Sequence, residues 1–325
     1  MIQKTEQQIM QFWKGDIANP VVSISCATYN HEKYINEALD GFLMQETDFP
    51  FEIVIGEDCS TDKTIKIIQQ YKEEYPNIIN LIAWPKNVGA LKNWMTVLDA
   101  CKGKYIANCE GDDYWISPFK LQKQVEVFES NSDCILCGTR VYVRRSESST
   151  PYKIEPSVKP EKLLSISADD LFFDKVPILM VSRMFPKNII KKYIECVQYD
   201  PANRDFLLKL FIVSQAGKTP GAILCVDDVM GCYRENIGGV WAFNDDMYKK
   251  RSDLRVLEFA IQHFEFPYHY RYLYKCLILL CESLGVTQTS IQSVNKHLKT
   301  RKTVLWKTTN QITKFLITEF KNLKY

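Results

Sequence analysis

Short apolar runs and amphipathic stretches alternate along the first 130 residues. The apolar runs are rich in β-branched residues, which predicts buried strands, and the stretches between them carry apolar residues at helical spacing. The strands are predicted at 21–29, 51–58, 78–84 and 105–109. The helices are predicted at 31–45, about 60–75, 90–101 and 118–128. Strand and helix in alternation predict an α/β fold, with a mostly parallel sheet covered by helices on both faces.

The rest of the chain follows a less regular pattern. Residues 144–162 are polar and contain three prolines, which predicts a loop or linker. From Asp245 onward the pattern becomes helical and basic. We therefore expect a helical lead-in, a main domain whose two halves flank the linker, and a helical C-terminal extension. The expected boundaries are 1–19, 20–243 (halves 20–143 and 163–243) and 244–325.

Composition narrows the class of protein. The 325 residues are 46% hydrophobic and 25% charged, with a net charge of +2 and a pI near 7.9. This balance gives no general attraction to nucleic acid. The N-terminus lacks the apolar core of a signal peptide, and no run of about 18 apolar residues predicts a transmembrane helix. We expect a cytoplasmic protein whose 11 cysteines are reduced thiols, with Cys134-x-x-Cys137 buried rather than metal-binding.

The segment 301–325 is basic and amphipathic. At 100° per residue, one stripe is apolar and lysines lie opposite it. Docking on the protein's own core is one interpretation. The other is peripheral contact with the inner face of the cytoplasmic membrane, because a basic face with aromatic neighbours suits anionic lipid.

Polar clusters follow each of the four predicted strands. Ligands in parallel sheets bind beyond the carboxyl ends of the strands, so we expect the clusters to meet in one crevice. Their sequences are T-Y-N-H-E, E-D-C-S-T-D, N-V-G and E-G-D-D.

The last of these clusters contains Glu110, Asp112 and Asp113. Crowded carboxylates repel unless a cation lies between them, and hard divalent cations prefer oxygen ligands completed by water and phosphate. We interpret the cluster as a Mg²⁺ or Mn²⁺ site. The alternative is a solvated turn that caps the next helix.

Three further side chains are candidates for binding or catalysis. Tyr29 ends the first strand and could stack on a base. Asp58 ends the second strand and could accept a hydrogen bond from a base or a sugar hydroxyl, whereas Asp62 is interpreted as a helix-start residue. Asp205 precedes the apolar helix 206–213, so it is either an N-cap or a general base.

The stretch Y-R-E-N-I-G-G-V-W at 233–241 combines a cation, two glycines and a Trp. Arg234 suits a phosphate, and Trp241 and Trp115 are candidate platforms for a sugar ring. An ordinary loop with buried aromatic side chains is the alternative interpretation.

Together these motifs resemble the family 2 glycosyltransferases, which are inverting enzymes with the GT-A fold. V-S-I-S-C-A-T-Y-N-H-E-K-Y-I resembles the opening strand and nucleotide-contacting turn of the family. F-E-I-V-I-G-E-D-C-S-T-D-K-T resembles its second signature, and K-G-K-Y-I-A-N-C-E-G-D-D-Y-W resembles the strand that leads to its D-x-D metal motif.

The resemblance implies roles for individual positions. Asp112 and Glu110 match the D-x-D acids, Glu110 replacing the usual Asp, and Asp205 matches the catalytic base. Asn236 stands where the family often has His, which puts a metal or diphosphate role for that position in doubt. The residues expected at the nucleotide-sugar donor are Thr28, Tyr29, Glu32, Asp58, Asn93, Asp112 and Arg234.

The implied activity is metal-dependent transfer of a sugar from a nucleotide-diphosphate-sugar, UDP-sugar favoured, to an acceptor hydroxyl. The acceptor is expected to be a saccharide or lipid-linked saccharide in bacterial surface polysaccharide synthesis. Two alternatives are a non-catalytic binding or scaffold module and a sugar nucleotidyltransferase. The second would require a Gly-rich basic loop after the first strand, where this chain has C-A-T-Y-N-H-E.

Overall fold

The computed structural model describes residues 4–145, 150–157, 162–197, 204–217 and 219–235, and six residues between 252 and 264. The chain divides into two compact units: Met1–Gln198 with Lys218–Ala242, and Tyr199–Gly217 with Phe243–Tyr325. Trp241, Asn236 and the amphipathic segment 301–325 lie outside the described residues. No helix in the part of the chain that the structure describes is both long and apolar enough to cross a bilayer.

The first half of the sheet is parallel, as the sequence predicts. Its strands follow the order β3-β2-β1-β4, so the chain winds outward from β1 in both directions. These strands are β1 Val22–Thr28, β2 Phe51–Glu57, β3 Ile79–Ala83 and β4 Tyr105–Asn108. The helices that alternate with them are α2 Ile35–Leu43, α3 Thr64–Glu74, α4 Ala90–Ala100 and α5 Lys120–Ser130.

The second half of the sheet is mixed rather than parallel. The order continues from β4 through β9, β6, β10 and β5, and β9 is antiparallel to both of its neighbours. β6 and β10 are parallel to each other. β7 pairs antiparallel with β6, and β8 pairs antiparallel with β10. The strands are β5 Tyr114–Trp115, β6 Leu136–Arg145, β7 Lys153–Glu155, β8 Leu163–Ser165, β9 Met184–Pro186 and β10 Ile223–Glu235.

The predicted linker 144–162 is therefore partly strand. β6 runs into it as far as Arg145, and β7 returns within it to pair antiparallel with β6. Strands before and after this segment, including β6 and β10, belong to the same sheet. The remaining helices are α1 Glu6–Met10, α6 Ala168–Phe172, η1 Met180–Ser182, α7 Lys187–Val197 and α8 Arg204–Ala216.

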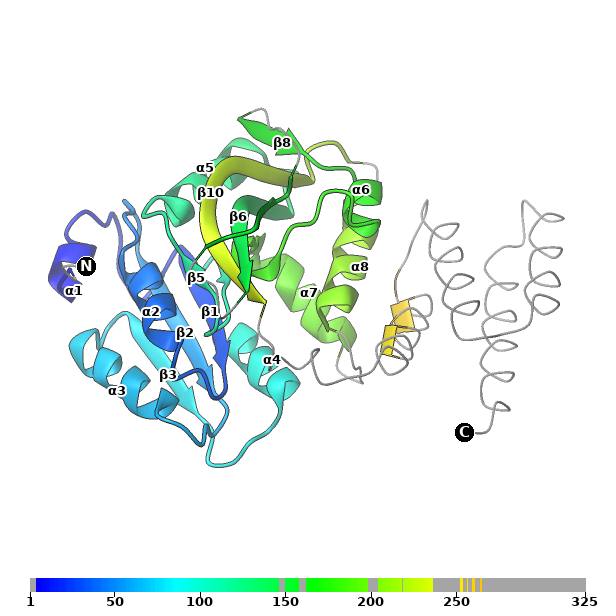
Figure 1. The fold of residues 1–325 in the computed structure, drawn as a ribbon. Helices are drawn as coiled ribbons and strands as arrows, with labels where there is room; N and C mark the ends of the chain where they lie inside the picture. The colour runs from blue at the N-terminus through cyan, green and yellow to red at the C-terminus, as the bar shows by residue number, and fades with distance from the viewer. Residues whose placement is uncertain are drawn as a thin grey trace, which may run out of the picture. The chain divides into compact units, whose positions relative to one another are not determined.

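The helices of the first half cover both faces of the sheet, with α2 and α3 on one side and α4 on the other (Figure 1). The α2 side forms the main apolar core, where Ile24 and Cys26 of β1 pack with Leu39 and Phe42 of α2. Alternate strand residues point to opposite faces, so the same strands present different side chains to α4. The core residues run along β1, β2 and β4 from their first residues to their carboxyl ends.

The cysteines of the described residues are free thiols, and most of them are buried. Cys134 and Cys137 are both buried, and their sulfur atoms lie near the backbone oxygens of Leu136 and Gly138. Burial raises the pKa of both thiols. These two cysteines are packed as small apolar side chains.

Candidate functional site

The acidic turn, residues 110–113, is held against the end of β1. The Gly111 N–H donates to the Ala27 carbonyl at 3.1 Å, which extends the pairing of β4 with β1 by one step. A Cβ on Gly111 would lie 2.6 Å from Thr28 Oγ1. Glycine is therefore required for this close approach, and the E-G-D-D sequence reflects it.

The carboxylates of the turn face two different environments. Glu110 is exposed and Asp112 is half-buried. Asp113 is 3% exposed, and its Oδ1 accepts the backbone N–H of Arg234 at 2.8 Å. Burial, with the charge of neighbouring Asp112, raises the pKa of Asp113. The predicted set of three metal-ligating acids is thus reduced to Glu110 and Asp112, because Asp113 ties the turn to β10.

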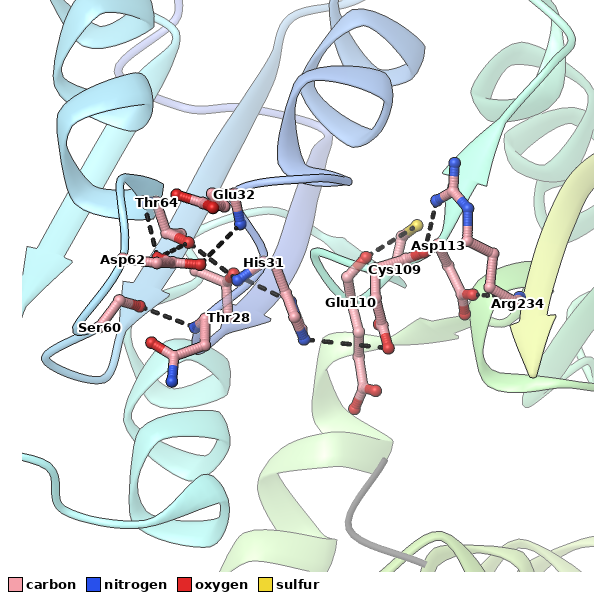
Figure 2. Close-up of polar contacts among 12 residues, drawn as sticks. Thr28, His31, Glu32, Ser60, Asp62, Thr64, Cys109, Glu110, Asp113 and Arg234 are labelled. Carbon is pink, nitrogen blue, oxygen red and sulfur yellow. Dashed lines mark hydrogen bonds and ion pairs between the residues drawn. The ribbon is translucent and has the colours of Figure 1, made fainter. Parts of the chain in front are cut away.

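A hydrogen-bonded brace joins the loop after β1 to the start of α3 (Figure 2). Asp62 accepts the N–H of Glu32 at 3.0 Å and the N–H of Thr64 at 2.9 Å. Thr64 Oγ1 in turn accepts the N–H of His31 at 2.8 Å. The Glu32 carboxylate accepts the N–H of Lys63 at 2.9 Å. Asp62 is therefore a helix-start residue as predicted, and Glu32, expected at the donor, instead supports this brace.

His31 lies between the brace and the acidic turn (Figure 2). Its Nδ1 is 3.1 Å from Thr28 Oγ1, and its Nε2 is 3.9 Å from Asp112 Oδ2. Burial lowers the pKa of His31, which favours the neutral imidazole. His31 was not among the expected site residues, although it stands in the T-Y-N-H-E cluster at a strand end.

Asp58 holds the loop between β3 and α4. Its two carboxylate oxygens accept the N–H groups of Val88 at 2.6 Å and Gly89 at 3.0 Å. The residue is 2% exposed. A contact with a base or ribose would use the remaining lone pairs, so that role stays a prediction. Tyr29 is 41% exposed at the same edge of the sheet, which leaves part of its side chain open to a ligand.

Asn93 is committed to packing inside the protein. Its Nδ2 donates to the Gly56 carbonyl at 2.8 Å, and its Oδ1 accepts from Trp84 Nε1 at 3.2 Å. A Cβ on Gly56 would lie 2.2 Å from Asn93 Oδ1. Asn93 was expected to contact the donor, but its amide joins α4 to β2 and to the loop after β3.

Trp115 lies in the core and does not present a face to a sugar. It is 1% exposed, and its Nε1 donates to the Val181 carbonyl at 2.8 Å. Phe42 contacts the ring edge-on, and Lys120 Nζ lies 4.1 Å from the ring centroid. The predicted acceptor platform is therefore wrong for Trp115, and the alternative of a buried aromatic side chain is correct. Trp241 lies outside the described residues.

Arg234 is a buried cation with protein partners. Its side chain is 0% exposed, and Nη2 lies 2.7 Å from Glu37 Oε1. The guanidinium also donates to the Asp112 carbonyl and lies over the rings of Tyr34 and Tyr114, 5.1 Å and 4.4 Å from their centroids. Arg234 was expected to bind phosphate. In this arrangement it fixes the backbone of the acidic turn instead.

Comparison with known proteins identifies the family. Residues 23–193, more than half of the chain, match the family described as Glycosyl transferase family 2. The chain belongs to glycosyltransferase family 2. This confirms the resemblance drawn from the three motifs at the ends of β1, β2 and β4.

Two relatives illustrate how far the similarity to curated proteins extends. An uncharacterized protein of Mycobacterium tuberculosis is 32% identical over 220 residues, which is 68% of this chain and 60% of the relative. TuaG of Bacillus subtilis, whose name places it provisionally in teichuronic acid biosynthesis, is 33% identical over 142 residues, 44% of this chain and 52% of its own length. The chain thus matches little more than half the length of these relatives.

Solved structures share the fold at low sequence identity. TarS 1–349 of S. aureus, in complex with UDP-GlcNAc, has a TM-score of 0.61 at 17% identity and covers 80% of this chain and 71% of its own. The mannosyltransferase PcManGT from Pyrobaculum calidifontis, in complex with GDP-Man and Mn²⁺, has a TM-score of 0.55 at 15% identity, with coverage of 98% and 93%. The fold of this family 2 glycosyltransferase chain is therefore the GT-A fold expected from its sequence.

The acidic turn suits a divalent cation of the kind that many GT-A enzymes use. The described residues contain no group of three or more His, Cys, Asp and Glu side chains that could enclose a metal ion. Glu110 and Asp112 offer carboxylate oxygens from an exposed and a half-buried position. Two carboxylates without a full protein cage fit Mg²⁺ or Mn²⁺, because these ions are commonly completed by water and substrate phosphates.

Asp205, the predicted base of this family 2 glycosyltransferase chain, is the second residue of α8 and is exposed. α8 belongs to the second compact unit. An acid in the first turn of a helix is stabilised by the helix dipole, so the residue also suits a purely structural role. Its assignment as general base stays a prediction.

Proposed function

We propose that this protein transfers a sugar from a nucleotide-diphosphate-sugar, with UDP-sugar favoured, to an acceptor hydroxyl with inversion of configuration. The observation that carries the proposal is the acidic turn 110–113, which is tied to β1 through Gly111 and to β10 through Asp113. This arrangement holds Glu110 and Asp112 at the strand edge where ligands of parallel sheets bind.

Each side chain of the proposed donor site has a separate task. Tyr29 stacks on the base, for which its exposed ring is suited. Asp112 and Glu110 hold the cation. A divalent cation, when bound there, supplies positive charge that stabilises the departing nucleoside diphosphate. Asp58 and Asp62 keep the neighbouring loops in position through the backbone hydrogen bonds that they accept.

Asp205 is the proposed base for the acceptor. Its carboxylate takes the proton of the acceptor hydroxyl while that oxygen attacks the anomeric carbon. The new bond joins the acceptor oxygen to the anomeric carbon, and the bond from that carbon to the diphosphate oxygen breaks. Attack from the face opposite the leaving group inverts the configuration, as in inverting chemistry with two carboxylates.

The wider role that we propose is synthesis of a bacterial surface polysaccharide, with a saccharide or lipid-linked saccharide as acceptor. The provisional assignment of TuaG to teichuronic acid biosynthesis supports this role. TarS and PcManGT, bound to UDP-GlcNAc and GDP-Man, support a nucleotide-sugar donor and leave the base of the nucleotide open. We further propose that the protein works in the cytoplasm or at the inner face of the cytoplasmic membrane.

Nucleotide release from a panel of donors tests the proposal. UDP-, GDP- and dTDP-sugars are incubated with the full chain and Mn²⁺, Mg²⁺ or chelator, because slow donor hydrolysis is detectable without the acceptor. We expect release from one nucleotide class and its loss with chelator. No release from any donor, together with no metal-dependent nucleotide binding, would contradict the proposal and favour a non-catalytic module. Pyrophosphate formation from a sugar phosphate and a nucleoside triphosphate would instead indicate a nucleotidyltransferase.

The exchange Asp205→Asn tests the proposed base. Removal of a general base is expected to lower the transfer rate by about 10²–10⁴-fold while the donor still binds. The measurements are the transfer rate with the identified donor and the affinity for its nucleoside diphosphate. An unchanged rate would leave Asp205 with its structural role at the start of α8, and another residue would then be the base.

A further inference from the structure

His31 faces the acidic turn 110–113, because its Nε2 lies at ion-pair distance from Asp112 Oδ2. Its side chain is 21% exposed and that of Asp112 is 19% exposed, so both lie partly shielded from solvent. The gap of 3.9 Å between Nε2 and Asp112 Oδ2 exceeds a direct hydrogen bond. A small rotation of either side chain, or one bridging water, would close it.

The backbone of His31 is fixed from the opposite side. Its N–H donates to Thr64 Oγ1 at 2.8 Å, and Thr64 Oγ1 itself bonds to the Asp62 carboxylate. A Cβ on Gly111 would lie 3.0 Å from His31 Nδ1, so the turn and the imidazole are already in close approach. The ring is therefore confined between the start of α3 and the acidic turn.

The surroundings of the ring select one tautomer. Thr28 Oγ1 lies 3.1 Å from Nδ1 and can either donate or accept a hydrogen bond. A carboxylate can only accept, so Asp112 favours the proton on Nε2. With Nε2 protonated, Nδ1 accepts a hydrogen bond from the Thr28 hydroxyl, and the Nε2–H is directed to Asp112. Thr28, which was expected to contact the nucleotide, thereby acquires a defined task in orienting His31.

We propose that His31 is a positioning residue that holds Asp112 Oδ2 through its Nε2–H, so that the Asp112 carboxylate is presented to the divalent cation in a single orientation. The proposal rests on the proposed function, since it concerns the same donor site. An N–H donor to a ligating carboxylate restricts its rotation before the cation arrives. Loss of such a supporting hydrogen bond typically weakens metal affinity by about 10–100-fold.

Two exchanges at position 31 test the donor atom. His31→Leu keeps a side chain of similar size and removes the N–H, whereas His31→Gln retains an amide N–H that can reach Asp112. The readout is Mn²⁺ binding by the full chain in the presence of UDP or GDP, measured from the electron paramagnetic resonance signal of free Mn²⁺. We expect His31→Leu to weaken Mn²⁺ binding by about 10-fold or more, and His31→Gln to recover most of the affinity.

Two further variants separate positioning from a general structural effect. In an Asp112→Ala background, which removes the oxygen that faces His31 Nε2, His31→Leu should cause no additional loss of Mn²⁺ affinity. Thr64→Val removes the hydroxyl that holds the His31 backbone and leaves the imidazole intact, so it should weaken Mn²⁺ binding less than His31→Leu does. Thermal unfolding of each variant shows whether the fold is retained.

Three results would overturn the proposal. The first is wild-type Mn²⁺ affinity in His31→Leu, and the second is equal loss in His31→Leu and His31→Gln with both variants folded. The third is an undiminished effect of His31→Leu in the Asp112→Ala background. If the wild-type chain itself binds no Mn²⁺ with either nucleotide, the proposed function fails and the role of His31 falls with it. Normal binding by wild type and by His31→Leu rejects the role of His31 alone.

Discussion

Two layers of side chains meet at the carboxyl ends of the strands, and they differ in what their polar atoms contact. The outer layer, which we call the rim, is exposed or half-buried and consists of Tyr29, His31, Glu110 and Asp112. The inner layer, which we call the underlayer, is at most 3% exposed and consists of Asn93, Asp113, Trp115, Lys120 and Arg234. The underlayer forms hydrogen bonds and ion pairs with the protein itself. These five residues near the strand ends therefore serve the protein's own packing, and most ligand contacts are expected in the rim.

The acidic turn shows the boundary between the layers within a few residues. Glu110 and Asp112 lie in the rim, whereas Asp113 and Trp115 lie in the underlayer. The Asp113 N–H donates to the Glu110 carbonyl at 3.1 Å and closes the turn, and the chain then enters β5, where Trp115 is buried. We therefore expect exchanges in the rim to change metal or nucleotide binding and the rate of nucleotide release. Exchanges in the underlayer should change the free energy of unfolding.

The largest expected effect in the rim follows from Asp112→Asn. Loss of a carboxylate that holds the cation should lower the rate of nucleotide release by at least about 10²–10³-fold, because metal stabilisation of the leaving group contributes several kcal/mol. The free energy of unfolding should change little, since Asp112 is half-buried at the rim. Steady-state release assays and urea unfolding measure the two effects separately.

Asp113→Asn is the matched control, because it removes the neighbouring carboxyl group and keeps an oxygen that can accept the Arg234 N–H. It should leave Mn²⁺ affinity within a small factor of wild type. A loss of affinity as large as that of Asp112→Asn would show that Asp113 contributes to the cation site. The distinction between rim and underlayer would then be wrong.

The largest expected effect in the underlayer follows from Trp115→Ala. The exchange removes a fully buried ring and its hydrogen bond to the Val181 carbonyl. It should lower the free energy of unfolding by about 3–5 kcal/mol, the usual range for Trp→Ala in a core. Urea unfolding monitored by circular dichroism measures the loss. An unchanged stability with weaker acceptor binding would restore the interpretation of Trp115 as a sugar platform.

These two layers also explain what the sequence alone could reveal. The four strands, their order in the chain and the crowding of polar residues after them follow from local patterns, and β1–β4 lie within a few residues of the predicted bounds. The placement of Trp115 depends on Val181, and that of Arg234 on Glu37, which lie far away in the chain. Local patterns carry no information on such distant partners.

The sequence-based prediction of the site was wrong at two residues: it omitted His31 and included Asn93. His31 follows a strand end directly, and its position in T-Y-N-H-E was sufficient reason to include it. Asn93 lies in α4, and its role depends on Gly56, where the missing side chain gives its amide room. A glycine two positions before a strand-end acid indicates a close approach, but it does not identify which residue approaches.

Tyr29→Ala should have a smaller effect, again confined to the rim. Stacking of a base on an aromatic ring contributes about 1–3 kcal/mol, so nucleotide affinity should fall by about 5–150-fold. Tyr29→Phe keeps the ring and should bind as wild type does. Titration calorimetry with UDP and GDP in the presence of Mn²⁺ compares the three proteins. Equal affinity in Tyr29→Ala would show that the base lies elsewhere along the rim.

The smallest effect concerns a charge in the underlayer, the buried ammonium of Lys120. Burial lowers the pKa of Lys120 to about 7. Nζ donates to Gln124 Oε1 at 2.7 Å and lies over the Trp115 ring. In the unfolded chain the pKa returns to about 10.5. Between pH 7 and about 10.5 the unfolded chain therefore binds more protons at this position than the native chain does.

Native stability conferred at Lys120 should consequently rise with pH across that window, by at most about 1.4 kcal/mol per pH unit. Lys120→Met isolates this contribution, because it removes the titrating group and loses the Gln124 hydrogen bond equally at every pH. Burial raises the pKa of the Cys109 and Cys137 thiols, so they stay neutral in the same range. Urea unfolding of both proteins at pH 7, 8 and 9 measures the difference. If the difference in unfolding free energy between the two proteins does not change with pH, Lys120 keeps its proton in the native state. The underlayer would then accommodate a charge as readily as the rim does.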